Sequence, residues 1–148
     1  MKHGKGVEFA EPPEDANSGL FLKIYDGEWK DDKRAGSGML FNAKQEIMYI
    51  GGFKDGKKAG DGNLYFKYDK NPELAYIEYE GQWKDDLREG KGIKMVFEAG
   101  KKVKKVRKYE GYWKSDKLEG KVIEFTYNFK DEPVKTYDGE YQGGKRSG

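Results

Sequence analysis

Aromatic and glycine residues recur along the chain in a fixed order. Five segments carry a tyrosine, a glycine two residues later and another aromatic residue two residues after that. We number them as repeats 1 to 5, and they begin at Tyr25, Tyr49, Tyr79, Tyr109 and Tyr137. Side chains alternate between the two faces of a β-strand, so the three residues would share one face, and the glycine would leave a hollow for a neighbouring ring. A helix would spread them around its axis and lose about 1 kcal/mol at the glycine, so the pattern predicts strands.

A polar segment rich in aspartate and glycine follows each of the first four predicted strands: KDDKRAG, KDGKKAG, KDDLREG and KSDKLEG. Such compositions favour tight turns. Short runs rich in strand-forming residues come next, such as NLYFKY from Asn63 and IKMVF from Ile93. Each repeat is therefore predicted to be a β-hairpin, and the whole chain an all-β antiparallel meander.

The sequence does not determine which face of the sheet the apolar residues of the second strands occupy. Leu64 shares its phase with the glycine two residues before it, whereas Ile93 and Met95 have the opposite phase to Gly92. Either a β-bulge intervenes, or both faces of the second strand are partly covered. The sequence does not decide between these alternatives.

The spacing of the repeats indicates one continuous array. The internal distance from the first glycine to a later glycine is nine residues in all five copies, and successive copies are offset by 24, 30, 30 and 28 residues. One hairpin cannot bury its own aromatic face, so neighbours must cover it, as in other repeat proteins. The predicted units of the single array 1–148 are 1–24 (partial), 25–48, 49–78, 79–108, 109–136 and 137–148 (partial).

Both ends of the chain look like incomplete repeats. HGKGVEF, from His3, matches the second half of a unit, and the chain stops where the second strand of repeat 5 should begin. The sequence therefore predicts either an excerpt of a longer array, or ends that another chain or homodimerisation completes.

Composition fits a thin structure. Hydrophobic residues make up 35% of the chain and charged residues 38%, yet aromatic residues reach 15%, so the apolar material is concentrated in a few large side chains. The net charge of +2 gives no strong field, and no nucleic-acid partner is expected. The chain contains no cysteine, long apolar run or signal-like N-terminus. We expect a soluble cytoplasmic protein, with cytoskeletal or membrane association as further options.

The phrase Y-x-G-x-W-x6-G-x-G resembles the MORN repeat. It matches at 25–38, 49–62 and 79–92, with W replaced by Phe53 in the second, and in part at 109–120. The resemblance implies an elongated, twisted antiparallel sheet without catalytic activity, and roles in scaffolding, partner docking, dimerisation or phospholipid contact. MORN-like repeats occur in junctional membrane proteins, plant lipid kinases, a lysine methyltransferase, and cytoskeletal and ciliary proteins. Most units here are longer than the usual one, so their hairpins should protrude further, and Val122 in place of a glycine should distort repeat 4.

Candidate catalytic and metal-binding residues are few. His3 is the only histidine, which nearly excludes a histidine-dependent acid–base or metal site. The paired aspartates Asp31/Asp32 and Asp85/Asp86 lack the spacing of a calcium loop and fit turns better. No phosphate-binding loop motif is present. We expect no enzyme activity, cofactor or metal.

The aromatic residues of the repeats are candidate partner-binding residues, because tyrosine and tryptophan are favoured anchors of protein interfaces. The alternative is that they only pack the repeats together. The candidates are Tyr25, Trp29, Tyr49, Phe53, Tyr79, Trp83, Tyr109 and Trp113.

A basic segment, KKVKKVRK, spans residues 101–108 and contains no acidic residue. On a protruding hairpin it could bind anionic phospholipid. Alternatively, it is a solvated arm whose lysines prevent strand-edge pairing. The candidate anion- or lipid-binding residues are Lys101, Lys102, Lys104, Lys105, Arg107 and Lys108.

Three functional hypotheses follow. The leading one is a non-catalytic scaffold that binds a protein partner through an aromatic-lined sheet face, with a cytoskeletal or ciliary assembly as its setting. The second is a membrane-surface adaptor that contacts anionic lipid through residues 101–108. The third is the regulatory arm of a larger enzyme.

Overall fold

The computed structural model describes residues 2–10 and 21–148, and these form one antiparallel sheet whose strands follow the order of the chain. Its regular elements are β1 (Gly4–Ala10), β2 (Leu22–Lys30), β3 (Lys33–Phe41), β4 (Ile47–Lys54), β5 (Lys57–Lys67), the 3-10 turn η1 (Pro72–Leu74), β6 (Tyr76–Lys84), β7 (Leu87–Glu98), β8 (Lys104–Lys114), β9 (Lys117–Tyr127), β10 (Pro133–Gln142) and β11 (Lys145–Arg146). The predicted all-β meander of hairpins is confirmed.

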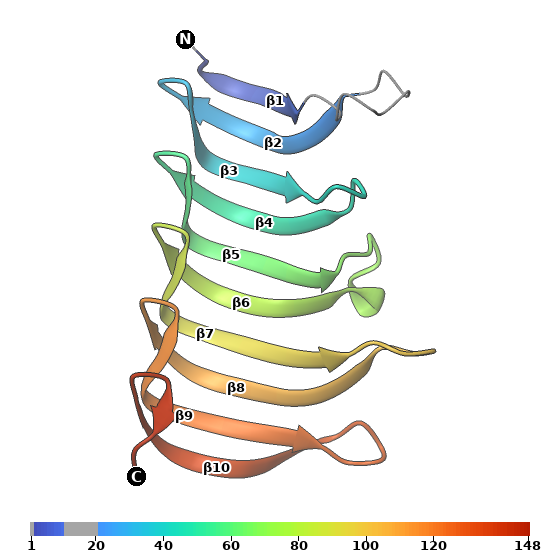
Figure 1. Cartoon of the computed structure of the whole chain (residues 1–148), viewed down its shortest axis with the longest axis vertical. Coiled ribbons are helices and arrows are strands. Elements are labelled where there is room, and N and C mark those ends of the chain that lie inside the picture. The colour runs from blue at the N-terminus through green and yellow to red at the C-terminus, as the bar shows by residue number, and fades with distance from the viewer. Residues whose placement is uncertain (1, 11–20) are drawn as a thin grey trace.

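The strands stack into a single curved layer (Figure 1). Tight turns lie along one long edge, which we call the turn edge, and longer connections lie along the other, the loop edge. The β7–β8 hairpin reaches beyond its neighbours at the loop edge, whereas the equally long unit of repeat 2 folds its connection into η1.

The tight turns follow from the aspartate- and glycine-rich segments. Both central residues of each turn have positive φ, for example 51° and 65° at Asp31 and Asp32, and 49° and 68° at Asp85 and Asp86. Positive φ at both positions is the requirement of type I′ hairpin turns, whose twist matches the twist of the flanking strands. Aspartate and glycine tolerate this conformation better than most residues do.

A row of glycines crosses the sheet from strand to strand. Gly27 pairs with Gly38, Gly38 with Gly51, and Gly51 with Gly62. The row continues through later pairs until Val122 takes the position of a glycine in β9. Since the tyrosines of the repeats flank this row, it forms a valley in which their rings can lie.

The open register is resolved in β7. Pairing with β8 is regular from Gly90 to Val96, so no bulge separates Gly92 from Lys94. Lys94 therefore shares the face of the repeat tyrosines, which we call the tyrosine face, and Ile93 and Met95 lie on the opposite face. Of the two alternatives, partial cover of both faces of the strand is the correct one. The side chain of Ile93 is 37% exposed and that of Met95 is half-buried.

Candidate functional site

The repeat tyrosines are held over the glycine valley. The hydroxyl of Tyr49 donates a hydrogen bond to the carbonyl of Gly52 at 3.0 Å, and the hydroxyl of Tyr79 donates to the carbonyl of Gln82 at 3.0 Å. Both side chains are completely buried, and burial raises the pKa of Tyr79 to about 12. A Cβ atom at Gly62 would collide with the Tyr49 ring. Each glycine therefore supplies the space that a tyrosine ring fills.

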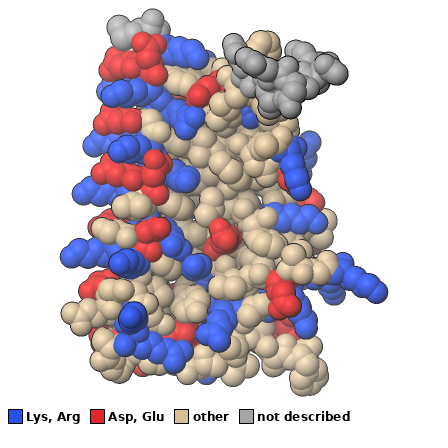
Figure 2. All heavy atoms as spheres, viewed as in Figure 1, with Lys and Arg blue, Asp and Glu red and all other residues tan. Residues whose placement is uncertain are grey.

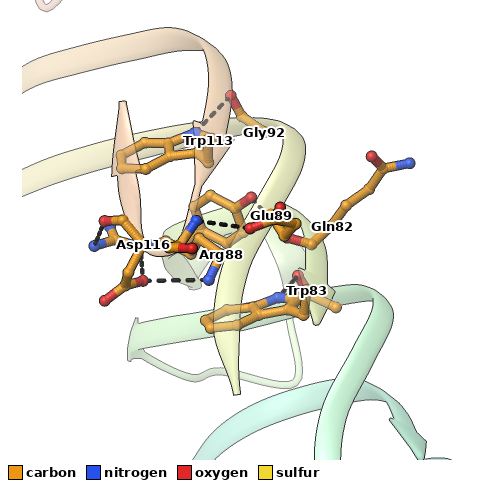
Figure 3. Close-up of polar contacts among 10 residues, drawn as sticks. Gln82, Trp83, Arg88, Glu89, Gly92, Trp113 and Asp116 are labelled. Atoms are coloured by element: carbon orange, nitrogen blue, oxygen red, sulfur yellow. Dashed lines mark hydrogen bonds and ion pairs between the residues drawn. The ribbon is translucent and has the colours of Figure 1, made fainter. Parts of the chain in front are cut away.

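The tryptophans join each repeat to the one before it (Figure 3). The indole Nε1 of Trp83 donates to the carbonyl of Gly62 at 3.1 Å, and that of Trp113 donates to the carbonyl of Gly92 at 3.4 Å. The Trp83 ring also makes an edge-on contact with Tyr49 of the preceding repeat, at 5.6 Å between centroids. These contacts supply the cover that a single hairpin lacks.

Basic residues of the second strands add further contacts between neighbouring repeats. The Arg88 guanidinium lies 4.3 Å from the centroid of the Trp113 ring, and its Nε atom forms an ion pair of 2.6 Å with Asp116 (Figure 3). Burial alone would raise the pKa of Asp116, but the hydrogen bonds from Arg88 outweigh it and lower the pKa. Like the Arg88 guanidinium over Trp113, the Lys58 ammonium lies over an aromatic ring, 5.1 Å from the centroid of Trp83. Each cation therefore contacts the tryptophan of the following repeat.

The turns also form hydrogen bonds with the backbone of the preceding repeat. The amide of Asp86 donates to the carbonyl of Lys58 at 3.2 Å, and the carboxylate of Asp86 accepts from the amide of Lys58 at 2.8 Å. Asp116 and Arg88 repeat the arrangement. The second aspartate of the turn motif therefore has a specific role between repeats, which its turn propensity alone does not reveal.

The eight predicted partner-binding residues lie in this packing. Seven of them are less than a tenth exposed and belong to one core cluster, which Tyr109 joins as a partly buried member. Their arrangement fits the structural alternative, and their binding role stays a prediction. Sequence reasoning missed the contribution of the basic residues, although a signal was present: four of the five second strands carry lysine or arginine at the same position, Arg34, Lys58, Arg88 and Arg146.

Repeat 4 differs from the others in the residues at two further positions, and the distortion expected from Val122 stays a prediction. Leu118 stands where the other repeats have a basic residue, and Glu124 lies on the tyrosine face beside Tyr109. Glu124 is 3% exposed and accepts hydrogen bonds from Arg146 at 2.7 and 2.9 Å, and from the hydroxyl of Tyr141. The Arg146 hydrogen bonds lower the pKa of Glu124 despite its burial. The buried Glu124 carboxylate is therefore neutralised by the half-exposed Arg146 of the following repeat.

One cavity lies where repeats 2, 3 and 4 meet. It has a volume of 670 Å³ and is lined by Trp83, Tyr112 and Trp113 among others. A second cavity of 450 Å³, which includes Ile93, shares Asp61 and Gln82 with it. We call the two together the Tyr112 groove.

The predicted lipid-binding residues lie in the β7–β8 hairpin at the loop edge. Lys101 and Lys102 are exposed in the connection, and Lys104, Lys105 and Arg107 are exposed in β8. Lys108 differs from them: it is partly buried, pairs with Glu110 at 2.9 Å and lies 4.5 Å from the centroid of the Phe125 ring. Figure 2 shows the basic tip projecting beyond the body of the sheet.

Two further findings bear on possible functions. Within residues 2–10 and 21–148, no group of three or more His, Asp or Glu side chains is placed to hold a metal ion. The same residues include no helix with the length and apolar character needed to span a membrane.

Comparison with known families gives one match. The family model for the MORN repeat matches five segments of the chain, residues 25–42, 49–67, 79–94, 109–121 and 137–148. No curated protein is significantly similar to the chain.

Proposed function

Because the chain belongs to the MORN repeat family, whose repeats are generally associated with scaffolds that bind membranes or proteins, we propose that it is a non-catalytic scaffold that binds a protein partner in the Tyr112 groove. The observation that carries the proposal is an exposed aromatic side chain in the 670 Å³ cavity. Tyr112 is 52% exposed although its neighbour Trp113 is 5% exposed.

The groove has the composition of a protein interface. Its exposed apolar side chains are Tyr112, which lines the first cavity, and Ile93, which lines the second and is 37% exposed. Charged side chains of both signs surround these two residues, including Lys84, Glu89 and Lys91. Protein interfaces commonly combine an apolar centre with a polar rim, and tyrosine is enriched among their strongest contacts.

The predicted partner-binding residues take a supporting position in this proposal. Trp83 and Trp113 line the groove, but their rings are mostly covered by the packing between repeats. We infer that they hold the shape of the groove while Tyr112 makes the principal contact. A cytoskeletal or ciliary assembly is the setting that we propose for the partner.

Substitution of Tyr112 tests the proposal. We expect Tyr112→Ala to weaken capture of a partner from an extract of the source cells by at least about tenfold, since loss of a central tyrosine commonly costs 2 kcal/mol or more. Phe129→Ala is the matched control, because Phe129 is 93% exposed at the loop edge, outside the groove. Quantitative mass spectrometry of the captured proteins measures the difference. Equal capture by wild type and Tyr112→Ala, with equal melting temperatures, would contradict the proposal.

A second candidate is contact with an anionic membrane through the loop edge. Exposed apolar residues accompany the basic hairpin there: Phe129 in the β9–β10 connection and Leu74, 54% exposed, in the β5–β6 connection. Basic residues attract anionic lipid headgroups, and apolar side chains can enter the interface. This combination favours a membrane-surface adaptor as the runner-up.

Liposome flotation tests the second candidate. We expect the quadruple variant Lys101/Lys102/Lys104/Lys105→Glu to lose at least about tenfold in affinity for phosphoinositide-containing vesicles, since each basic residue near the surface contributes about 1 kcal/mol. The matched control reverses four exposed lysines of the turn edge and so changes the net charge equally. These control residues are Lys30, Lys54, Lys84 and Lys114. Equal flotation of the two variants would contradict a specific role of the basic hairpin.

A further inference from the structure

Repeat 3 places a charge where the first two repeats have an apolar residue. In repeats 1 and 2 a leucine, Leu40 or Leu64, pairs with tyrosines of the two neighbouring strands on the tyrosine face. Lys94 takes this position in repeat 3, between Tyr79 and Tyr109. A leucine there continues the apolar packing, whereas a lysine brings an ammonium group into it.

Repeat 4 leaves its tyrosine ring outside the glycine valley. Val122 is 1% exposed, and one of its methyl groups lies 3.0 Å from the position that a Cβ atom at Gly111 would occupy. The valine therefore fills the hollow that a tyrosine ring fills in the earlier repeats. Tyr109 is only partly buried, whereas Tyr79 is completely buried.

These departures meet in one cavity on the tyrosine face, which we call the Lys94 cavity. It has a volume of 340 Å³, and its lining includes Lys94, Tyr109, Trp113 and Leu118. Leu118 is one more departure, since the other repeats carry a basic residue at its position. The cavity thus combines aromatic and aliphatic walls with a lysine that the repeat pattern does not require.

Charges around the cavity leave Lys94 without a close carboxylate. Arg88 also lines it but is engaged with Asp116, through its Nε atom at 2.6 Å and through Nη2 to the Asp116 carbonyl at 3.1 Å. In the described part of the chain, no carboxylate lies within 4.0 Å of the Lys94 ammonium. Burial lowers the pKa of Lys94, and Arg88 lowers it further, while Glu78 and Asp116 act in the opposite direction from a distance. An additional anion would therefore stabilise this ammonium group.

We propose that the Lys94 cavity binds an aspartate or glutamate side chain from an acidic segment of a protein partner. The Lys94 ammonium forms the ion pair, and the partly buried ring of Tyr109 contacts the methylene groups of the bound side chain. A carboxylate carries one negative charge, which the single Lys94 ammonium matches, whereas the second charge of a phosphate dianion would need a further cation and Arg88 is already paired with Asp116. Trp113 lines both this cavity and the Tyr112 groove, but Lys94, Tyr109 and Leu118 line this cavity and not the groove, so binding can be assigned to one of the two sites.

Titration with a simple acidic peptide tests the inference. The probe is the capped decapeptide (Gly-Glu)5, and (Gly-Gln)5 is its uncharged counterpart. All proteins carry Lys101/Lys102/Lys104/Lys105→Gln, so that the basic hairpin does not bind the probe. We expect saturable amide chemical-shift changes at Lys94, Tyr109 and Leu118 with the acidic peptide alone.

Two lysine variants distinguish the cavity from general charge attraction. Lys94→Leu restores the residue type of Leu40 and Leu64, and we expect it to stay folded and to lose at least about tenfold in affinity, a factor that corresponds to about 1.4 kcal/mol. Lys121→Leu removes the same charge from an exposed position on the opposite face, outside the groove, and should bind as before, as should Tyr112→Ala.

Three outcomes would overturn the inference: no binding of the acidic peptide, shift changes confined to residues outside the cavity, or equal loss of affinity in Lys94→Leu and Lys121→Leu. The shift map of the protein with Lys94 intact decides the matter even if Lys94→Leu fails to fold. Loss of peptide binding in Tyr112→Ala would instead assign the peptide to the groove.

Discussion

Trp83→Ala is expected to destabilise the protein by about 3–5 kcal/mol, the usual cost of removing a large buried aromatic side chain. Trp83 is 6% exposed and contacts tyrosines of two repeats, Tyr49 at 5.6 Å and Tyr79 at 5.0 Å between ring centroids. Its indole also satisfies the carbonyl of Gly62. Since whole domains are stable by only about 5–15 kcal/mol, the loss should be plain in urea unfolding followed by circular dichroism.

Trp83→Phe is the matched control for this experiment. Repeat 2 already has a phenylalanine, Phe53, at the equivalent position and buries it to 5% exposure. The phenylalanine variant keeps most of the ring packing and loses the indole hydrogen bond, for an expected cost of about 1 kcal/mol plus the smaller ring's lost contact. If Trp83→Ala costs no more than Trp83→Phe, the tryptophan does not join repeats as we describe.

Gly81→Ala is expected to cost about 3 kcal/mol or more, at the upper end of the cost of overpacking a filled interior. A Cβ atom at Gly81 would lie 2.5 Å from the Cα atom of Gly92 and 2.6 Å from the carbonyl oxygen of Lys91. Both contacts are with backbone of the paired strand, so no side-chain rotation can relieve them. Adjacent strands would have to separate across the glycine valley.

Gly100→Ala provides the comparison for this substitution. The nearest atom to a Cβ at Gly100 is 3.8 Å away, and its φ lies outside the positive range, so we expect a change of no more than about 0.5 kcal/mol. Thermal and urea unfolding of both variants give the two values. Similar stability of Gly81→Ala and Gly100→Ala would show that the valley can widen without cost.

The sequence allowed the strand positions and the faces of the aromatic residues to be predicted, because both depend on local periodicity. The alternation in YEGQW places Tyr79, Gly81 and Trp83 on one face whatever lies beside them. The aspartates of the turns are similarly informative, since few residues tolerate positive φ at two successive positions.

Contacts between repeats could not be predicted from the same periodicity. The pattern indicates that the rings of Tyr49 and Trp83 must be buried. It does not indicate that the Tyr49 ring packs against the tryptophan of the following repeat. That assignment depends on strand register and curvature, which are properties of the whole sheet.

The candidate site was harder to predict for a related reason. The residues chosen as partner-binding, such as Tyr79 and Trp83, have the chemistry of interface anchors, and the same chemistry makes them good core residues. The Lys94 cavity depends on the register of β7, which the sequence left open. Departures from a repeat become informative only when their positions on a face are known.

The tryptophans and the turn aspartates contact the repeat that precedes their own, and this polarity of the stack restricts how arrays could associate. Trp113 reaches back to Gly92, and Asp116 reaches back to Arg88, so the leading and trailing surfaces of a repeat are different. Two molecules that used these contacts would join head to tail, an arrangement that propagates into a filament instead of closing. A symmetric homodimer of this protein would therefore require contacts of another kind.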